Sequence, residues 1–396
     1  MDIFANHIVD RISLTNPGTT AFFIYSIILA AIFLSISKAP KKQEFLNFSQ
    51  TEQLRGIAIL LIILGHLKTN VLARNDYLSF YFGDCGVSLF LFLSGYGLMR
   101  SHQAKNATLS HFIKRRVNRV FIPYWITTLL FLLLDYYLLS ETYPLKLIIL
   151  TVLGLNFNLK LQLLDYGRWF ITFILFFYLL FYLATRFKQI GAQMLILIAV
   201  PIAMCYLNYF FQIITPYNPP RQLTHLSPAL GGWNPWHLFL LLFPAGFLAG
   251  AYIEKLKRVF PAPERFQWNG LPLAVLFLSL FLFIGRTTVT HSFYGIFYTS
   301  LIINLSRICL ALFVIFIFAF FSSFNIQFRI LSLLGFLSYE LYLLHDAFMV
   351  KYDFMLFRLP VKYSFPLFLL VISILAYALR RVASANYFKI PGRRQR

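Results

Sequence analysis

The sequence is poor in charged residues, in acids and in cysteine. Charged residues make up 12% of the 396 residues, whereas soluble domains contain about 25%, so an ordinary water-soluble domain is excluded for most of the chain. The three cysteines are an odd number and lack the paired spacing of a metal site or a disulfide framework. We therefore expect neither thiol chemistry nor a metal site.

Apolar residues are abundant instead, at 59% of the chain. They form successive runs of roughly 17 to 25 residues, long enough to cross about 30 Å of hydrocarbon as a helix, and a lipid environment requires that backbone polar groups be satisfied internally. We therefore expect an all-α polytopic transmembrane helix bundle of about ten to eleven spanning helices. The expected spans are 20–37, 55–70, 86–100, 121–139, 168–185, 191–211, 237–253, 270–286, 296–321, 331–349 and 363–380.

The chain has 35 Lys and Arg against 14 Asp and Glu, a formal charge of +21. Such an excess is typical of proteins that bind nucleic acid, anionic lipid or an anionic substrate. No nucleic-acid motif is present, and the charge is distributed among the loops. If the first helix begins outside, every strongly basic segment lies inside, as the positive-inside rule requires. We expect a multi-pass protein of the cytoplasmic (inner) membrane that contacts membrane lipid, has a cytoplasmic C-terminus and binds no nucleic acid.

Three regions are expected along the chain. An extra N-terminal transmembrane helix and a basic linker occupy 1–49, a membrane domain occupies 50–380, and a basic cytoplasmic tail occupies 381–396. Segment 145–163 is apolar but interrupted by Gly and Asn, and a full span there would place the basic tail outside. We expect a re-entrant or surface helix. The outer loop 212–236, rich in Pro, Gly and Trp, suits interfacial contact or a cap over a site.

Three ionisable residues lie on one stripe of the helix expected after residue 50. Eleven residues at about 100° each bring His66 within about 20° of Arg55 around the helix, while the two residues are about 16 Å apart along the helix axis. Glu52 lies near the same stripe and can pair with Arg55 at i,i+3. Ionisable residues inside a membrane helix are costly and point to a functional site. Equally, Arg55 could snorkel to one interface and His66 could anchor at the other.

Two further segments offer binding groups. Ser94, with Gly95 and Gly97, permits close helix approach or leaves space for a thin ligand. Arg115, Arg116 and Arg119 precede a helix start marked by Pro123, and their guanidinium groups suit phosphates. Lipid headgroups and the phosphates of a nucleotide-containing donor remain alternative partners for this cluster.

Near the C-terminus, Ser338, Tyr342 and His345 share a helix stripe, while Glu340 lies on a different face. The simpler interpretation of this stripe is a polar contact between helices. On the same interpretation, His345 and Asp346 mark the outer end of the helix.

Together these segments resemble the acyltransferase-3 family of membrane acyltransferases, which includes O-acetyltransferases of bacterial surface polysaccharides, over roughly residues 50–380. The family's opening signature is similar to Glu52, Leu54-Arg55-Gly56 and His66. Its later motifs resemble Phe90 to Tyr96, the Arg115, Arg116 and Arg119 segment before Pro123 and Tyr124, and Ser338 to His345. The chain departs from many members at Ser88, where they carry Asp, and near Ile174, where they carry Glu, which indicates a subfamily with different acceptor contacts or acid-base support.

The resemblance implies an acyl-CoA-dependent O-acyltransferase. An acyl group, acetyl by default, would pass from cytoplasmic acetyl-CoA or another acyl-CoA to a hydroxyl of a cell-surface or exported glycan, without a metal. His66 would act as general base, a role that suits histidine near neutral pH, with Arg55 and Glu52 as its catalytic companions. The expected coenzyme A contacts are Arg115, Arg116, Arg119 and Ser94. A covalent acyl-His relay is the variant mechanism.

Two other classes of function remain compatible with these residues. A transporter or flippase of an anionic glycolipid or polysaccharide precursor would also contain intramembrane Arg and His. Such folds often show repeated halves with broken helices, and no internal repeat is found. A non-catalytic assembly protein is the other alternative, for which replacement of His66 would have no effect.

Overall fold

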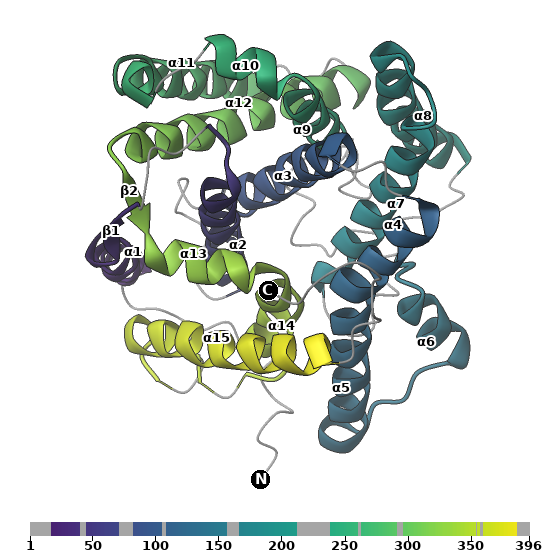
Figure 1. The fold of residues 1–396 in the computed structure, drawn as a ribbon. Coiled ribbons are helices and arrows are strands. Elements are labelled where there is room, and N and C mark those ends of the chain that lie inside the picture. Colours follow the sequence, from purple (N-terminus) through teal and green to yellow (C-terminus); the bar gives the residue numbers. More distant parts are fainter. Residues whose placement is uncertain are drawn as a thin grey trace.

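The computed structural model describes residues 17–39, 45–70, 82–104, 108–156, 166–211, 238–259, 263–290, 296–353, 355–356 and 359–385. Nearly all of these residues are helical (Figure 1). The elements are α1 Pro17–Leu34, β1 Ile36–Lys38, α2 Phe48–Asn70, α3 Phe82–Ala104, α4 Leu109–Arg116, the π-helical turn η2 Val117–Phe121, α5 Ile122–Leu139, α6 Leu145–Val152, the 3-10 turn η4 Tyr166–Arg168, α7 Trp169–Ala184, α8 Ile190–Phe211, α9 Leu242–Ala251, α10 Ile253–Val259, α11 Pro263–Thr290, α12 Ile296–Ser323, β2 Ile326–Phe328, α13 Arg329–Phe336, α14 Ser338–Val350 and α15 Val361–Ala385.

The expected all-α membrane bundle is confirmed. Each predicted apolar span overlaps a helix, except that 237–253 covers α9 and the start of α10, and 331–349 covers the broken pair α13 and α14. Among the described residues, four helical runs are long and apolar enough to cross a membrane, and the broken pair makes a fifth. Five shorter apolar helices accompany them. The protein is therefore an integral membrane protein, while the number of helices that span the bilayer stays a prediction.

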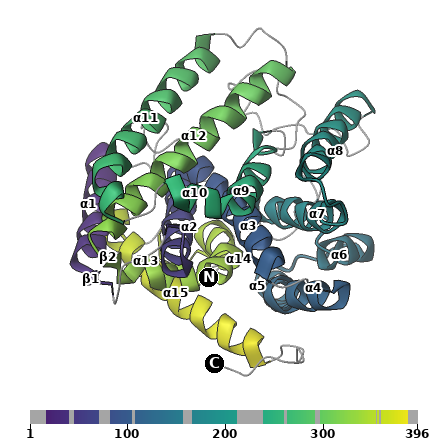
Figure 2. The ribbon, with the colours of Figure 1, turned by 45° about the horizontal axis from the view of Figure 1, so that its top comes forward.

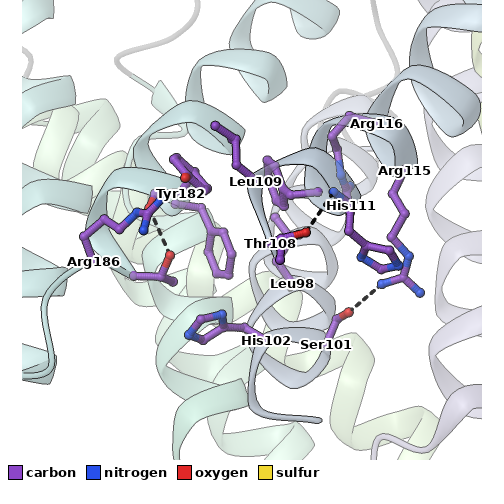
Figure 3. A pocket seen from close by; sticks show the side chains of 13 residues that line it. Leu98, Ser101, His102, Thr108, Leu109, His111, Arg115, Arg116, Tyr182 and Arg186 are labelled. Atoms are coloured by element: carbon purple, nitrogen blue, oxygen red, sulfur yellow. Dashed lines mark hydrogen bonds between the residues drawn. The ribbon is translucent and has the colours of Figure 1, made fainter. Parts of the chain in front are cut away.

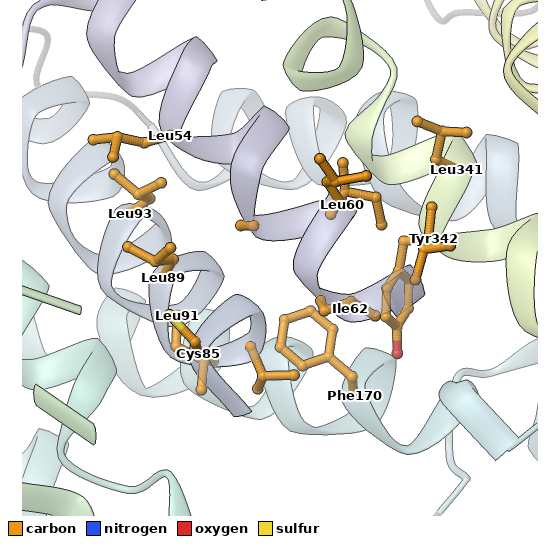
Figure 4. Close-up of a cluster of buried hydrophobic side chains, with 14 of the residues drawn as sticks. Leu54, Leu60, Ile62, Cys85, Leu89, Leu91, Leu93, Phe170, Leu341 and Tyr342 are labelled. Atoms are coloured by element: carbon orange, nitrogen blue, oxygen red, sulfur yellow. The ribbon is translucent and has the colours of Figure 1, made fainter. Parts of the chain in front are cut away.

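Helix α2 lies in the middle of this assembly, among α3, α12, α13 and α14 (Figures 1 and 2). Its apolar residues and those of α3 form part of one large core, which also includes Phe170 of α7 and Tyr342 of α14 (Figure 4). Large apolar side chains on the outer helices point away from the core; Phe22 and Phe283 are 72% and 69% exposed. Apolar residues facing outward are the expected partners of lipid tails.

Glycines allow α2 and α3 to approach their neighbours closely. A Cβ atom on Gly56 of α2 would overlap the backbone oxygen of Leu331 in α13, and one on Gly335 of α13 would overlap that of Glu52. Between α3 and α9, a Cβ on Gly95 would in the same way overlap the carbonyl of Phe243. Small residues are the usual solution where membrane helices pack backbone to backbone. Packing is therefore the structural role of Gly95, one of the two uses predicted for its segment.

The start of the helix at Pro123 differs from expectation. Helix α4, the turn η2 and α5 form one continuous run from Leu109 to Leu139, so Pro123 lies inside the run. Proline has no backbone N–H and cannot complete the usual bond to residue 119. The backbone widens there instead, and the N–H of Ile122 donates to Val117, five residues back. The basic segment thus begins the helix that enters the membrane domain.

The predicted span 331–349 is not a single straight helix. Helices α13 and α14 meet at an angle of 79°, because Leu337 between them leaves the helical conformation, with φ −96° and ψ 5°. Segment 145–163 begins with α6, whose eight residues extend only about 12 Å. That helix alone is too short to cross a bilayer, and residues 157–163 lie outside the described residues, so the re-entrant or surface helix stays a prediction.

A two-stranded antiparallel pairing joins distant parts of the chain: Ile36 faces Phe328 and Lys38 faces Ile326. The side chain of Gln53 in α2 accepts a hydrogen bond from the Phe328 backbone N–H at 2.9 Å. The N-terminal helix is therefore attached to the segment between α12 and α13. The predicted outer loop 212–236 and tail residues 386–396 lie outside the described residues.

Candidate active site

The ionisable residues of α2 contact other helices at two different depths. Glu52 and Arg55 lie near its first turns, where α13 crosses it, and His66 lies near its far end, where α14 approaches. We call the region around Arg55 and the C-terminal ends of α3, α7 and α15 the basic end, and the region around His66 the opposite end. The predicted stripe therefore connects the two ends of the bundle through one helix.

At the opposite end, His66 pairs with a carboxylate. Its Nδ1 lies 2.7 Å from Oδ1 of Asp346 in α14. The Asp346 side chain is 7% exposed and that of His66 is 23% exposed. Because a carboxylate accepts hydrogen bonds, Nδ1 of His66 carries the hydrogen and Nε2 presents a lone pair when the ring is neutral. A carboxylate–imidazole pair of this kind orients a general base and stabilises its protonated form.

A second imidazole stands beside this pair. The rings of His66 and His345 are 5.0 Å apart between centroids and meet edge to face at 78°. His345 is completely buried, and its ring lies 5.8 Å from that of Tyr342. The Tyr342 hydroxyl donates to the backbone carbonyl of Gly167, just before α7. The polar contact predicted between helices is thus present, but Asp346 does more than mark the helix end, because it holds the candidate base.

At the basic end, acids and guanidinium groups alternate around the start of α2. Arg380 of α15 donates to both carboxylate oxygens of Glu340 at 3.2 Å, and Glu340 is buried. Glu52 interacts electrostatically with Arg55 and with Arg380. Arg55 reaches toward α3, since a Cβ on Gly97 would lie 3.9 Å from its Nη2 atom. Glu52 therefore interacts with Arg55 through charge, as predicted, and it interacts in the same way with Arg380 of α15.

A cavity of about 130 Å³ opens next to this cluster. Arg115 and Arg116 of α4 form one side, and Tyr182 and Arg186 from the end of α7 form the other (Figure 3). The Arg115 guanidinium donates to the Ser101 hydroxyl at 3.0 Å. The other lining residues are Leu98, His102, Thr108, Leu109, His111, Phe112, Phe181 and Thr185. Cationic forks combined with hydroxyls make a wall suited to an anion such as a phosphate.

Tyr178 links this cavity to the stripe on α2. The guanidinium of Arg116 lies 4.6 Å from the Tyr178 ring centroid, and Tyr178 also interacts electrostatically with Arg55. The Arg116 Nε atom and the Tyr182 hydroxyl are buried, and neither has a hydrogen-bond partner within the described residues. Two polar groups of the residues that line the cavity therefore lack a hydrogen bond within the described part of the chain.

The other predicted contacts lie around this cavity. Arg119 is exposed on the same helical run and is outside the cavity lining. Ser94 is partly buried on α3, three residues before Gly97 and so on the same helix face. Their roles in binding a donor stay predictions.

Ser88, at the position of the family's Asp, donates to the backbone oxygen of Asp84 at 2.6 Å, and Asp84 pairs with Arg307 of α12. A carboxylate is thus present one turn from the expected position.

Arg168 is a charged residue of the opposite end that sequence reasoning missed. It is 2% exposed, its Nη1 donates to the Thr128 hydroxyl at 2.7 Å, and its guanidinium lies 4.9 Å from the Tyr124 ring centroid. It follows directly after Gly167, the residue bound by Tyr342. The sequence feature that could have drawn attention to Arg168 is its position immediately before a long apolar run.

An ion network encloses the opposite end. The ammonium of Lys351, just after α14, lies 2.8 Å from Asp135 of α5 and 3.1 Å from Glu141. The Tyr143 hydroxyl lies 2.5 Å from Glu141 Oε2 and 2.7 Å from Asp135 Oδ2. Partial burial raises the pKa of Glu141, but the hydrogen bonds from Tyr143 and Lys351 and the charge of Lys351 lower it more, so its pKa lies below the ordinary value. This network connects α14, which carries Asp346, to α5.

Replacing Glu141 with glutamine should make stability less sensitive to acid. A carboxyl with a depressed folded-state pKa stabilises the fold above its unfolded-state pKa, and this contribution is lost as pH falls through the folded-state value. We expect the wild type to lose melting temperature more steeply than Glu141→Gln below pH 4.5, the ordinary Glu value, with a difference under about 1 kcal/mol because the group is partly exposed. Thermal unfolding in detergent between pH 6 and 3.5 measures this, and parallel curves would contradict it.

A family model described as an acyltransferase domain matches residues 49–379. A search of curated proteins returns no match. The matched range includes α2 with Glu52, Arg55 and His66, the cavity-forming helices and the Asp346 helix. Because the match covers most of the chain and agrees with the sequence resemblance, the protein belongs to the acyltransferase-3 family and is a membrane acyltransferase.

Proposed function

We propose that this enzyme transfers an acyl group, acetyl in the first instance, from cytoplasmic acyl-CoA to a hydroxyl of a cell-surface or exported glycan. The observation that carries the proposal is the pairing of His66 with Asp346 at one end of α2 and the arginine-lined cavity at the other. A base and an anion site at opposite ends suit a reaction whose donor and acceptor arrive from different sides of the membrane. The basic end would then face the cytoplasm, in accord with the positive-inside rule.

In the proposed reaction, Nε2 of His66 removes the proton of the acceptor hydroxyl as its oxygen attacks the thioester carbonyl. Asp346 accepts the Nδ1–H of His66 and stabilises the imidazolium that forms. The tetrahedral intermediate collapses, the carbon–sulfur bond breaks, and the imidazolium returns its proton to the leaving thiolate. The products are an ester and free coenzyme A. In the acyl-His variant, the same Nε2 attacks the thioester first.

The donor would bind from the basic end. Arg115 and Arg116 supply guanidinium groups for phosphate oxygens, and the Tyr182 hydroxyl is a further donor in the cavity wall. The acyl arm would extend past Tyr178 and Arg55 toward His66, along the contacts that connect the cavity with α2. Arg55 would position the donor, aligned by Glu52.

Removing Arg115 and Arg116, two of the three arginines that line the cavity, should weaken donor binding more than turnover. For the double variant Arg115→Gln/Arg116→Gln we expect KM for acetyl-CoA to rise about tenfold or more, since each charge-assisted hydrogen bond contributes about 1.5–3 kcal/mol, with a smaller change in kcat. Initial rates at varied acetyl-CoA measure both constants.

Lys114→Gln is the matched control for charge, because Lys114 is exposed, adjacent in sequence and absent from the cavity lining. It should leave KM within about twofold. An equal rise in KM for the control would mean that general surface charge rather than the cavity attracts the donor.

Transfer of radiolabelled acetyl in sealed membrane vesicles tests the function itself. Acetyl-CoA supplied outside inside-out vesicles should label glycan hydroxyls, and acetyl-CoA supplied outside right-side-out vesicles should not, because the basic end would then be enclosed. Label that is released by mild base identifies an ester. Alkali-resistant label would indicate an amine acceptor, and no label with any acyl-CoA would favour a different donor or transport.

A further inference from the structure

The tautomer of His345 is set by its own helix. Its Nδ1 lies 2.9 Å from the carbonyl oxygen of Tyr342 and 3.1 Å from that of Leu341. Carbonyl oxygens only accept hydrogen bonds, so Nδ1 carries the hydrogen. In the neutral ring Nε2 is then a lone-pair acceptor, and the ring is wholly buried.

This acceptor is unsatisfied within the described part of the chain: Nε2 of His345 is buried and has no hydrogen-bond partner there. Leaving a buried acceptor unpaired is unfavourable, and such groups in native proteins call for an explanation such as a functional role. The unsatisfied acceptor belongs to the imidazole that packs against His66, with 5.0 Å between the ring centroids. A donor that satisfies it would therefore lie next to the candidate base.

We propose that His345 Nε2 accepts a hydrogen bond from a second hydroxyl of the acyl acceptor, on the carbon next to the hydroxyl that His66 deprotonates. This inference rests on the proposed function and specifies its acceptor as a vicinal diol, such as a pair of neighbouring ring hydroxyls of a sugar. A hydroxyl hydrogen bond spans about 2.8 Å, so two hydroxyls on adjacent carbons can each reach one of two rings placed this closely.

Aromatic and apolar side chains make up much of the surroundings of this acceptor, and the Asp346 carboxylate also interacts with His345. The Tyr342 ring lies 5.8 Å from that of His345 and 5.3 Å from that of Phe170, and these two aromatic side chains lie beside Ile62 of α2 (Figure 4). Desolvating a hydroxyl there costs less than desolvating an ammonium group, and the hydrogen bond to His345 Nε2 offsets that cost. A hydrogen bond in such low-dielectric surroundings also discriminates more strongly than one in water.

Two small probes test the proposal in purified enzyme with acetyl-CoA: cis-cyclohexane-1,2-diol and cyclohexanol. The wild type should use the diol with a kcat/KM about tenfold or more above that of cyclohexanol, beyond the statistical factor of about two for its second hydroxyl. His345→Leu should reduce this preference to the statistical factor by losing activity on the diol alone. His345→Gln, which can present an amide oxygen near the position of Nε2, should restore part of the preference.

An unchanged preference in His345→Leu would overturn the proposal and indicate that a buried water satisfies Nε2. Equal loss on both probes in a folded His345→Leu would also overturn it, by giving His345 a general role in the reaction. If His345→Leu does not fold, a measurement on the unaltered enzyme tests the proposal instead. In ¹⁵N-histidine spectra, the diol should shift the His345 Nε2 resonance and cyclohexanol should not, with the resonance assigned by its absence from the spectrum of His345→Gln. No shift with the diol would contradict the proposal. Failure of the wild type to acetylate either probe would count against the proposed function, while the spectrum still tests the binding of the diol.

Discussion

Replacing His66 with alanine is expected to lower kcat for acyl transfer by about 10²–10⁴-fold, the usual contribution of general acid–base catalysis. The lost group is the lone pair at Nε2, which Asp346 orients through the 2.7 Å contact at Nδ1. KM for acetyl-CoA should change little, because the arginine cavity lies at the other end of α2. The measurement is initial-rate kinetics with radiolabelled acetyl-CoA at matched protein levels.

His66→Asn separates loss of the base from loss of the contact with Asp346. An asparagine amide can still donate to the carboxylate but cannot take up a proton, so it should be as inactive as alanine while it preserves the melting temperature better. Asp346→Asn leaves the base in place with a weaker partner, and we expect a smaller loss, roughly tenfold to a hundredfold. Wild-type rates in His66→Ala would remove the catalytic assignment and favour the transporter or the assembly protein.

Replacing Gly56 with alanine should prevent correct folding, although it adds a single methyl group. The added Cβ would overlap the Leu331 carbonyl oxygen, a backbone atom that no side-chain rotation can move. Overpacking commonly costs about 1–3 kcal/mol, and we expect the upper part of this range or more, because Gly335 makes the reciprocal contact with Glu52 at the same crossing. The yield of monodisperse protein in detergent and its melting temperature measure the effect.

Gly191→Ala is the matched control, since Gly191 is also in a helix and a Cβ there meets nothing within 4 Å. This change should be neutral or slightly stabilising, as alanine is the better helix former. Equal melting temperatures for Gly56→Ala and Gly191→Ala would mean that α2 and α13 separate at little cost. The Leu54-Arg55-Gly56 signature would then need a reason other than packing.

Much of the architecture was predictable from local properties of the chain. Apolar length and basic loops located the helices, since spanning a bilayer constrains each segment separately. Helix periodicity placed Arg55 and His66 on one stripe, and both face neighbouring helices. The ends of helices were less predictable, as at Pro123, where the missing N–H widens a continuous helix rather than beginning one.

The tertiary partners were not predictable, because periodicity carries no information about them. Asp346 looked like an ordinary residue near a helix end, and only its contact with His66 gives it significance. The break at Leu337 has no counterpart in the sequence, because the apolar run from α13 into α14 reads as one continuous segment. The burial of Arg168 depends on the Thr128 hydroxyl and the Tyr124 ring, both about 40 positions earlier in the chain.

The pairing of His66 with Asp346 joins residues 280 positions apart, and the strands β1 and β2 join parts of the chain separated by a similar distance. During biosynthesis, therefore, the first helices enter the membrane long before their partners have left the ribosome. A chain interrupted between α2 and α14 contains the base but not the carboxylate that orients it. We expect catalytic competence to arise only when translation is nearly complete, so that prematurely terminated chains embedded in the membrane are inert toward acyl-CoA.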